Sequence, residues 1–347
     1  MDSNQNKPLV IAGPCSAETR TQVLNIAQSL QDIPEVQVFR AGIWKPRTRP
    51  GGFEGAGEEG LSWLQEVKQT TRLQVATEVA TPQHVAMAVA YDIDVLWIGA
   101  RTTVNPFLMD ALAEALHGTE KMIYIKNPVN PDLALWIGGV ERFMNQNICN
   151  LGVIHRGFST YDKTQFRNQP EWQIAIDFRN QFPLLPMIAD PSHIAGNRIG
   201  LQGIAQKAMH LGYSGLMIET HDRPDEAWSD AQQQITPQTL KLLLDSLEYR
   251  FPEVLLPNFQ SQLANFRSQI DELDLKIVDL LGKRMAIATE IGGIKKANQV
   301  TILQNKRWVQ LLQTMTEQGR NKGLSEHFML NLFKAIHQES ISHQENV

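Results

Sequence analysis

The chain has 347 residues, of which 42% are hydrophobic and 20% are charged, so it can bury a large core as a barrel with an appendage or as two domains. Its formal net charge of -5 gives no general attraction to nucleic acid or to an anionic membrane, so any phosphate site must use locally placed cations. The N-terminus is polar and no stretch is apolar for the length of a spanning helix, which predicts a cytoplasmic protein.

Short apolar or β-branched runs alternate with longer helical stretches between residues 9 and 221, a pattern typical of βα units and a parallel sheet. We expect strands at residues 9–12, 36–39, 74–77, 95–99, 122–125, 148–154, 184–189 and 215–218. Eight parallel strands within about 240 residues favour a (β/α)8 TIM barrel over a doubly wound sheet, and no Gly-rich dinucleotide fingerprint opens the first unit. The predicted fold is therefore an α/β barrel over residues 1–250.

An all-α region follows the barrel. Pro252 and Pro257 break the helical pattern, so residues 251–258 are expected to link the barrel to a helical domain at 259–347. Apolar residues at three- and four-residue steps predict a long amphipathic helix at about 259–297. Shorter helices are expected at about 306–318 and 325–344, with Gly323 placed to end the second helix and Ser325 to cap the third.

The long helix carries an apolar stripe that two short partners cannot cover, so we expect a homodimer through the helical domain. Gly292 and Gly293 lie inside this helix, where each costs about 1 kcal/mol relative to Ala. Such a pair predicts either close helix packing or a local bend at that point.

Charged side chains follow the predicted strands, and in a barrel of this kind catalytic groups project from the C-terminal ends of the strands. These polar and charged residues are Cys15, Arg40, Lys45, Arg47, Thr48, Glu78, Arg101, Lys126, His155, Arg156, Asp190, His193, Glu219 and Asp230. Taken singly, each is explained more simply as a solvated loop residue. Six Lys and Arg residues at one end, however, would repel each other unless they face a polyanion such as two phosphates and a carboxylate.

Four residues of this set form a second group: Cys15, His193, Glu219 and Asp230. A thiolate, an imidazole and two carboxylates suit a divalent metal such as Mn, Fe, Co or Zn, rather than a closed structural Zn site or a Mg site. The alternatives are that Cys15 is a small buried hydrophobe and His193 a hydrogen-bonded loop histidine. Cys149 falls inside the sixth predicted strand, where we expect a small buried residue.

Several short motifs around these residues resemble, in order, those of type I 3-deoxy-D-arabino-heptulosonate 7-phosphate (DAHP) synthases of the short beta subtype. The motifs are Gly13-Pro14-Cys15-Ser16, Arg40, Lys45-Pro46-Arg47-Thr48, Gly99-Ala100-Arg101-Thr102-Thr103, Ile125-Lys126-Asn127, Asp190-Pro191-Ser192-His193, Ile218-Glu219 and Ser229-Asp230. The related octulosonate 8-phosphate synthases usually carry Ala-Asn-Arg-Ser where this chain has Pro46-Arg47-Thr48, which favours the four-carbon aldose phosphate.

The resemblance implies the condensation of phosphoenolpyruvate with erythrose 4-phosphate. Arg101, Lys126 and Arg156 would then hold phosphoenolpyruvate, with Arg40 and Lys45 completing the site. Arg47 and Thr48 would hold the phosphate of erythrose 4-phosphate. A metal on Cys15, His193, Glu219 and Asp230 would polarise the aldehyde, and Lys45 is the candidate proton donor to the developing alkoxide.

Two cations interrupt the apolar face of the long helix. Arg284 and Lys295 are 11 residues apart, which is about three turns and roughly 16 Å of rise, and they point the same way. Their long side chains could converge on a small dianion, or they could pack their stems and extend the charges into water. Ser340 and Gln344, an i, i+4 polar pair late in the third helix, favour the anion site.

This region resembles AroQ-type chorismate mutases at Arg267, Arg284, Lys295, Arg307, Ser340 and Gln344. The resemblance implies the rearrangement of chorismate to prephenate, with arginines gripping two carboxylates while Lys295 and Gln344 stabilise the ether oxygen. This chain has Trp308 where the family usually has Glu, and Gln304 where Asp is common, and both changes affect the contact to the substrate hydroxyl.

Two further expectations concern the helical domain as a whole. Arg267 lies 17 residues from Arg284, roughly 100° away around the helix, so we expect it to act in the partner's mutase site. Prephenate or chorismate bound to the helical domain is expected to inhibit the barrel. The alternative is that the helical domain mainly senses prephenate or chorismate and holds the dimer together.

Overall fold

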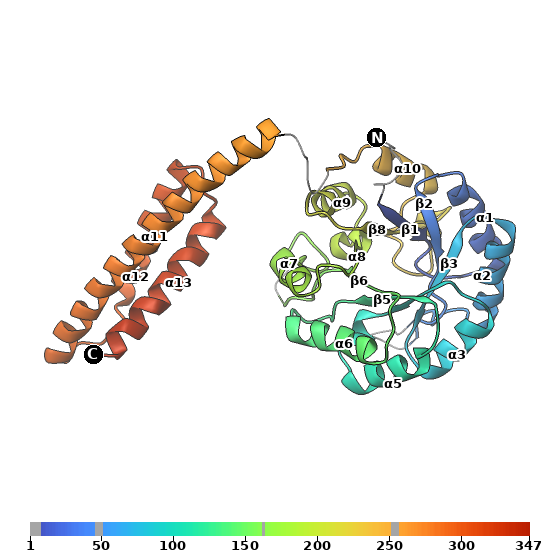
Figure 1. Cartoon of the computed structure of the whole chain (residues 1–347), viewed down its shortest axis with the longest axis horizontal. Coiled ribbons are helices and arrows are strands. Elements are labelled where there is room, and N and C mark those ends of the chain that lie inside the picture. Colours follow the sequence, from blue (N-terminus) through green and yellow to red (C-terminus); the bar gives the residue numbers. More distant parts are fainter. Residues whose placement is uncertain (1–7, 46–50, 162–163, 251–256) are drawn as a thin grey trace. The chain divides into compact units, whose positions relative to one another are not determined.

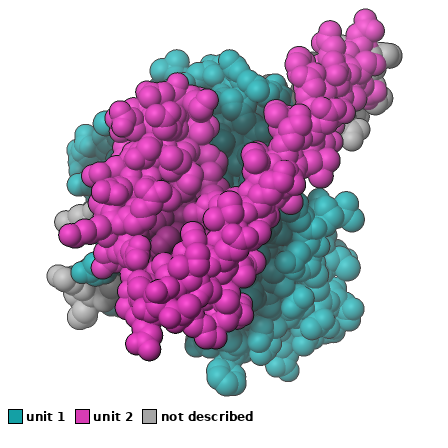
Figure 2. Space-filling model, turned by 90° about the vertical axis from the view of Figure 1, so that its left-hand side faces the viewer, with its two compact units in different colours: residues 1–252 teal, residues 253–347 magenta. Residues whose placement is uncertain are grey.

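The computed structural model of the chain describes residues 8–45, 51–161, 164–250 and 257–347. The chain divides into two compact units, residues 1–252 and residues 253–347 (Figure 2). Each unit has its own secondary structure and packing.

The first unit is a closed barrel of parallel strands in sequence order (Figure 1). Its strands are β1 (Leu9–Gly13), β2 (Val36–Arg40), β3 (Gln74–Val79), β4 (Val95–Ile98), β5 (Met122–Lys126), β6 (Leu151–His155), β7 (Met187–Ala189) and β8 (Gly215–Glu219). The barrel closes where β1 pairs with β8, with Leu9 opposite Gly215 and Gly13 opposite Glu219. The TIM-barrel prediction is therefore confirmed.

Helices separate the strands of the barrel. They are α1 (Arg20–Gln31), α2 (Glu58–Thr70), α3 (Pro82–Ala90), α4 (Ala100–Thr103), α5 (Pro106–Leu116), α6 (Leu133–Asn145), α7 (Trp172–Gln181), α8 (Pro191–Ala195), α9 (Leu201–His210) and α10 (Pro237–Asp245), with a 3₁₀ turn at Pro224–Glu226. Side-chain caps start many of them: Thr81, Asn105 and Asp190 each accept a backbone N–H of the first turn and are followed by a proline that fits the first helical position.

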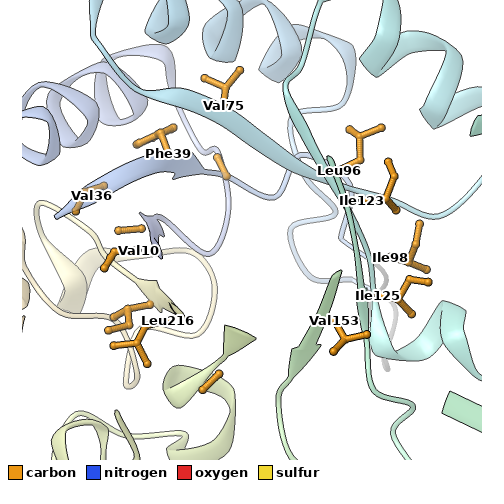
Figure 3. Close-up of a cluster of buried hydrophobic side chains, with 14 of the residues drawn as sticks. Val10, Val36, Phe39, Val75, Leu96, Ile98, Ile123, Ile125, Val153 and Leu216 are labelled. Carbon is orange, nitrogen blue, oxygen red and sulfur yellow. The ribbon is translucent and has the colours of Figure 1, made fainter. Parts of the chain in front are cut away.

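The barrel has two apolar layers. Side chains such as Ile11, Trp97 and Ile188 form a buried cluster of their own. A second and larger cluster joins the strands to the helices, and Figure 3 shows its members on β1 to β6 and β8. Because both faces of the strands are buried, strands such as β1, β4 and β8 are nearly continuous apolar runs, as in other parallel sheets.

Two strands are shorter than predicted, and Cys149 is the residue most affected. The prediction of a buried Cys149 inside a strand is wrong, because β6 begins only at Leu151 and the Cys149 thiol is exposed. Asn147 adopts a positive φ of 57° after α6, so the chain turns before it can pair. Likewise β7 begins at Met187, since the preceding Pro186 has no N–H to donate.

The second unit consists of α11 (Pro257–Ala297), α12 (Asn305–Asn321) and α13 (Glu326–Glu345) (Figure 1). These helices agree with the predicted ones within a few residues, and Ser325 caps α13 as expected. A Cβ added to Gly292 would lie only 2.8 Å from Cα of Gln344, so α11 and α13 pack closely at that point, as predicted.

A long apolar face of α11 remains exposed in the single chain. Its exposed members are Phe266, Ile270, Leu273, Ile277, Leu280, Ile287, Ile291 and Ile294. Within the described part of the chain, no helix is long and apolar enough to cross a membrane.

Candidate functional site

A polar cavity of about 390 Å³ lies at the C-terminal ends of the barrel strands. Its lining includes Lys45, Glu78, Arg101, Lys126, Arg156, Arg167, Asn168, His193 and Asp230. A second cavity, of about 630 Å³, lies at the opposite ends of β1, β3, β4 and β5, where Lys121 pairs with Asp92. Of these two cavities, as lined by described residues, the first alone gathers several Lys and Arg side chains. The first cavity is therefore the candidate active site.

Buried carboxylates hold the cations of this cavity in place. Lys126 Nζ lies 2.8 Å from Asp190 Oδ2, and both side chains are almost fully buried. Burial alone would raise the pKa of Asp190, but His193 and Lys126 outweigh it and hold that pKa well below its usual range. Burial lowers the pKa of the Arg156 guanidinium to about 10, and Arg167 and Arg101 contribute to this lowering. The cavity is therefore crowded with positive charge and suited to a polyanion.

Three of the four predicted metal ligands lie together: the ligand atoms of Cys15, Glu219 and Asp230 are all within 4.8 Å of one another. His193 lies beside them, with Nε2 3.8 Å from Glu219 Oε1, and its other ring nitrogen, Nδ1, lies 2.8 Å from Asp190. Burial lowers the pKa of His193, which keeps a neutral ring able to act as a ligand. Glu219 Oε1 is buried and accepts no hydrogen bond from a described residue, although Arg40 lies 3.4 Å away, so this oxygen keeps the capacity to bind a cation.

Without a cation, the thiol of this cluster is protonated. Burial, together with the charge of Glu219, raises the pKa of Cys15 to about 11. Its Sγ lies 3.6 Å from Asp230 Oδ2. Burial would raise the pKa of Asp230, but Arg167 and His193 outweigh it and lower that pKa, so this ligand stays ionised.

Two buried glutamines after Asp230, which the sequence analysis missed, support the cluster. Gln233 Nε2 donates to Glu219 Oε2 at 2.6 Å. Gln234 Oε1 accepts the Cys15 backbone N–H at 3.0 Å, and its Nε2 donates to the Ser229 carbonyl. The signal in the sequence is weak, because glutamine runs in loops are usually solvated.

Arg40 and Lys45 reach the cluster from β2 and the loop after it. Arg40 lies 3.4 Å from Glu219 Oε1 and over the Trp97 ring, and is buried behind the described lining of the cavity. Lys45 Nζ donates to the Cys15 carbonyl at 2.6 Å. Burial lowers the pKa of Lys45, but Cys15 and the nearby carboxylates outweigh it and raise this pKa, so the ammonium stays charged. Arg47 and Thr48 lie outside the described residues.

Two other residues differ from the expectations. Arg167, which was not predicted, lines the cavity and lies 3.1 Å from Asp230, with a further hydrogen bond to Gln233. His155, expected at the mouth, instead lies in the core, where its Nε2 donates to the Pro170 carbonyl at 2.6 Å and its Nδ1 accepts from the Tyr213 hydroxyl at 2.9 Å. The alternation of side chains along a strand explains this, because His155 and Arg156 point in different directions.

The helical unit gathers part of its predicted site between α11 and α13. Arg284 donates to the Ser340 hydroxyl, and Lys295 Nζ donates to Gln344 Oε1 at 2.8 Å. Arg267 and Arg307 are exposed and make no ion pair with a described residue. Four of the six residues predicted for this site are therefore paired within one chain.

The barrel matches a family model described as the DAHP synthetase I family, over residues 1–251. The chain belongs to the DAHP synthetase I family. The helical unit of this DAHP synthase matches a second model, chorismate mutase type II, over residues 266–345. The chain thus joins a DAHP synthase to a chorismate mutase domain.

Curated relatives agree with the barrel assignment. The phospho-2-dehydro-3-deoxyheptonate aldolase of Thermotoga maritima is 29% identical over 239 residues, covering 69% of this DAHP synthase and 68% of the relative. A 2-dehydro-3-deoxyphosphooctonate aldolase of Wolinella succinogenes is 27% identical, covering 69% of this chain and 97% of the relative. A crystal structure of the Thermotoga enzyme has a TM-score of 0.62 at 27% identity and covers 71% of this chain and 70% of that one.

Proposed function

We propose that the cation-lined cavity binds phosphoenolpyruvate and erythrose 4-phosphate, and that the side chains around it carry their metal-dependent condensation to DAHP. The observation that best supports this is one cavity that combines Arg101, Lys126 and Arg156 with a neighbouring cluster of thiol and carboxylate ligands. Two phosphates and a carboxylate would neutralise the cations that otherwise repel one another.

Arg101, Lys126 and Arg156 are assigned to the phosphate and carboxylate of phosphoenolpyruvate. Guanidinium groups match these anions with two parallel hydrogen bonds, and Lys126 adds a point charge fixed by Asp190. Lys45 completes the site from the cavity lining, and Arg40 does so from behind that lining, where it pairs with Glu219. Arg47 and Thr48 are assigned to the phosphate of erythrose 4-phosphate on their resemblance to the family motif.

A divalent metal ion, Mn, Fe, Co or Zn, fits the donors of Cys15, His193, Glu219 and Asp230. The mixed soft and hard donors, the neutral imidazole and the Glu219 oxygen that accepts no hydrogen bond from a described residue support this assignment. When bound, such an ion supplies Lewis-acid polarisation of the aldehyde oxygen. Gln233 and Gln234 keep Glu219 and Cys15 oriented, as groups behind metal ligands commonly do.

Lys45 is assigned as the proton donor. When C3 of phosphoenolpyruvate attacks the aldehyde carbon, the carbonyl oxygen gains charge, and a charged ammonium at the base of the cavity can give it a proton. Water then adds at C2 of the former enol phosphate, and phosphate leaves. The surrounding cations stabilise the phosphate as it departs.

In the helical unit, Arg284 and Arg307 are assigned to the carboxylates of chorismate, Ser340 to a further polar contact, and Lys295 with Gln344 to the ether oxygen. The pairing of Lys295 with Gln344 supports this, because it brings a donor from α11 and an amide from α13 to one point. The rearrangement is unimolecular, so restraint of the substrate and stabilisation of the developing charge suffice.

The exposed apolar face of α11 supports a homodimer in which Arg267 completes the partner's mutase site. Arg267→Ala and Lys295→Ala proteins should each be nearly inactive as mutases. After mixing and re-dimerisation, half of the dimers are mixed and each has one intact site, so about a quarter of the wild-type activity should return. Exchange of subunits without any recovery would place Arg267 in its own chain's site or in none.

Prephenate is proposed as an inhibitor of the synthase. Its binding to the helical unit would have to favour one of two states of the chain. Prephenate titrated into the synthase assay should lower the rate, and Arg284→Ala should remove the response. An unchanged rate at saturating prephenate would end this proposal.

The most direct test measures both reactions on one purified protein, with and without a chelator. Condensation should stop on metal removal and recover when Mn, Fe, Co or Zn is added back singly, whereas chorismate loss should continue. If chorismate binds but is not consumed, the helical unit is a sensing and dimerising module rather than a mutase.

A further inference from the structure

A stacked aromatic pair joins α12 to α13 beside the cations of the helical unit. The rings of Trp308 and His337 have centroids 3.9 Å apart and an interplanar angle of 27°. Both side chains are half-buried. His337 precedes Ser340 by three residues and Gln344 by seven, so all three lie on one face of α13. His337 therefore belongs to the face that meets Arg284 and Lys295.

The ring of His337 is neutral and has hydrogen-bonding capacity to spare. Burial lowers its pKa, and the charges of Arg284 and Lys295 lower that pKa further. A neutral imidazole offers one N–H donor and one acceptor nitrogen. Over the described residues, neither ring nitrogen of His337 forms a hydrogen bond, and Trp308 contributes only its ring face to the pair. The structure thus holds a polar ring in a fixed plane with no protein partner for its nitrogens.

The polar groups of chorismate leave one contact unassigned. Two carboxylates and the ether oxygen are matched by the arginines, Lys295 and Gln344. The Ser340 hydroxyl already accepts from Arg284 and donates to the Ile336 carbonyl, so the ring hydroxyl of chorismate has no partner among these residues. A Trp at 308 cannot accept a hydrogen bond from that hydroxyl, because an indole is a donor only. His337 lies about one turn before Ser340 on the same face of α13, and its acceptor nitrogen has no hydrogen bond to a described residue.

We propose that His337 binds the ring hydroxyl of the mutase substrate and that Trp308 is a positioning residue that fixes the plane of the imidazole. This inference rests on the proposed mutase site. In this proposal the Trp308–His337 pair contacts the substrate hydroxyl in place of the Glu that the family usually has at position 308. The two residues come from different helices, so the contact also links α12 to the site.

The test compares chorismate with an analogue that lacks only the ring hydroxyl. The wild-type chain should prefer chorismate by roughly 3- to 10-fold in kcat/KM, the size of one neutral hydrogen bond. His337→Leu should remove this preference, and His337→Gln, which keeps an acceptor, should retain part of it. Trp308→Ala should weaken the preference, and Trp308→Phe, which keeps a stacking ring, should preserve it.

His343→Leu is the matched control, because that histidine lies on α13 but contacts Thr289 and Glu339. Its preference for chorismate over the analogue should equal that of the wild type, and thermal unfolding of the helical unit checks that every variant is folded. If His337→Leu still preferred chorismate over the analogue as strongly as the wild type does, the inference would be overturned. Calorimetric affinities for the two compounds give the same ratio without turnover. A chain that binds chorismate but does not rearrange it would therefore lose the mutase assignment, while the His337 contact is still decided.

Discussion

The barrel cavity and the helical site both gather cations for anionic substrates, but they differ in how those cations are held. In the barrel, Lys126 and Arg40 are buried and pair with carboxylates from other strands. In the helical unit, Arg284 and Lys295 are half-buried, and their partners among the described residues are neutral: a hydroxyl, a thioether, an amide and a carbonyl. A closed sheet thus preorganises its charges with opposite charges, whereas a pair of helices leaves them available and relies on the substrate or a partner for completion.

The largest expected effect distinguishes the two sites by whether their reactions require a metal ion. Cys15→Ala should lower the condensation rate by more than roughly 100-fold, because it removes a direct ligand rather than a supporting group. The mutase rate of the same protein should stay within about twofold, since no metal-ligand group is found among the described residues of the helical unit. Cys149→Ala, at the exposed thiol, is the control and should leave both rates intact. A wild-type condensation rate in Cys15→Ala would contradict the metal assignment.

The reverse separation comes from the helical unit. Lys295→Ala should lower mutase kcat by roughly 100-fold, the usual cost of losing a donor to a developing charge. Condensation without prephenate should be unaffected. Lys296→Ala changes the neighbouring lysine, which contacts the carbonyl of Val347, and should keep the mutase rate. Equal losses in both lysine variants would show a general effect on the helix rather than on the site.

The buried His155 of the barrel predicts a pH dependence of the barrel's stability. Burial lowers the pKa of His155 from 6.5 to about 4, so the unfolded chain binds more protons than the folded chain between these values. This contribution is fully present above pH 6.5, is lost as the pH falls towards 4, and amounts to about 3 kcal/mol.

Denaturant titrations of the barrel unit at pH 7 and pH 4.5 check this contribution. His155→Gln should be less stable at pH 7 but should lose less stability on acidification than the wild type. His210→Gln, at an exposed histidine of α9, should follow the wild type. If His155→Gln lost as much unfolding free energy between pH 7 and pH 4.5 as the wild type, groups other than His155 would control the pH dependence.

A smaller effect tests the groups behind the metal ligands. Gln233→Ala should weaken metal affinity by about 10- to 100-fold, because Glu219 loses the donor that orients it. Equilibrium dialysis of the metal measures this loss directly. Gln232→Ala, at the exposed preceding residue, should bind metal like the wild type. Unchanged affinity in Gln233→Ala would make this glutamine a packing residue only.

The smallest effect concerns the packing of α11 on α13. Gly292→Ala gains up to about 1 kcal/mol of helix propensity but places a Cβ 2.8 Å from Cα of Gln344, and overpacking of this kind costs about 1–3 kcal/mol. We expect a net loss of roughly 1 kcal/mol and a lower mutase rate. Gly293→Ala meets only Val347 at 3.6 Å and should be stabilising. Thermal unfolding of the helical unit should therefore move in opposite directions in the two variants.

Much of the fold and of the barrel site was predicted from the spacing of hydrophobic residues and from the polar residues that follow the strands. Alternating βα runs predicted the barrel, and the ligand types that follow its strands predicted Cys15, Glu219 and Asp230 as one cluster, because parallel strands end at the same edge. The three-helix order and the close approach at Gly292 could also be read from spacing and glycine placement.

Tertiary structure decided what local patterns could not. The apolar run around Cys149 resembles a strand, but the left-handed Asn147 turns the chain and exposes the thiol. Arg167 and Gln233 reach the cluster of Cys15, Glu219 and Asp230 only because their loops fold over the barrel mouth, and solvated loops have the same composition. The spacing of hydrophobic residues depends only on neighbours along the chain. Contacts between loops depend instead on closure of the barrel, because closure brings β8 beside β1.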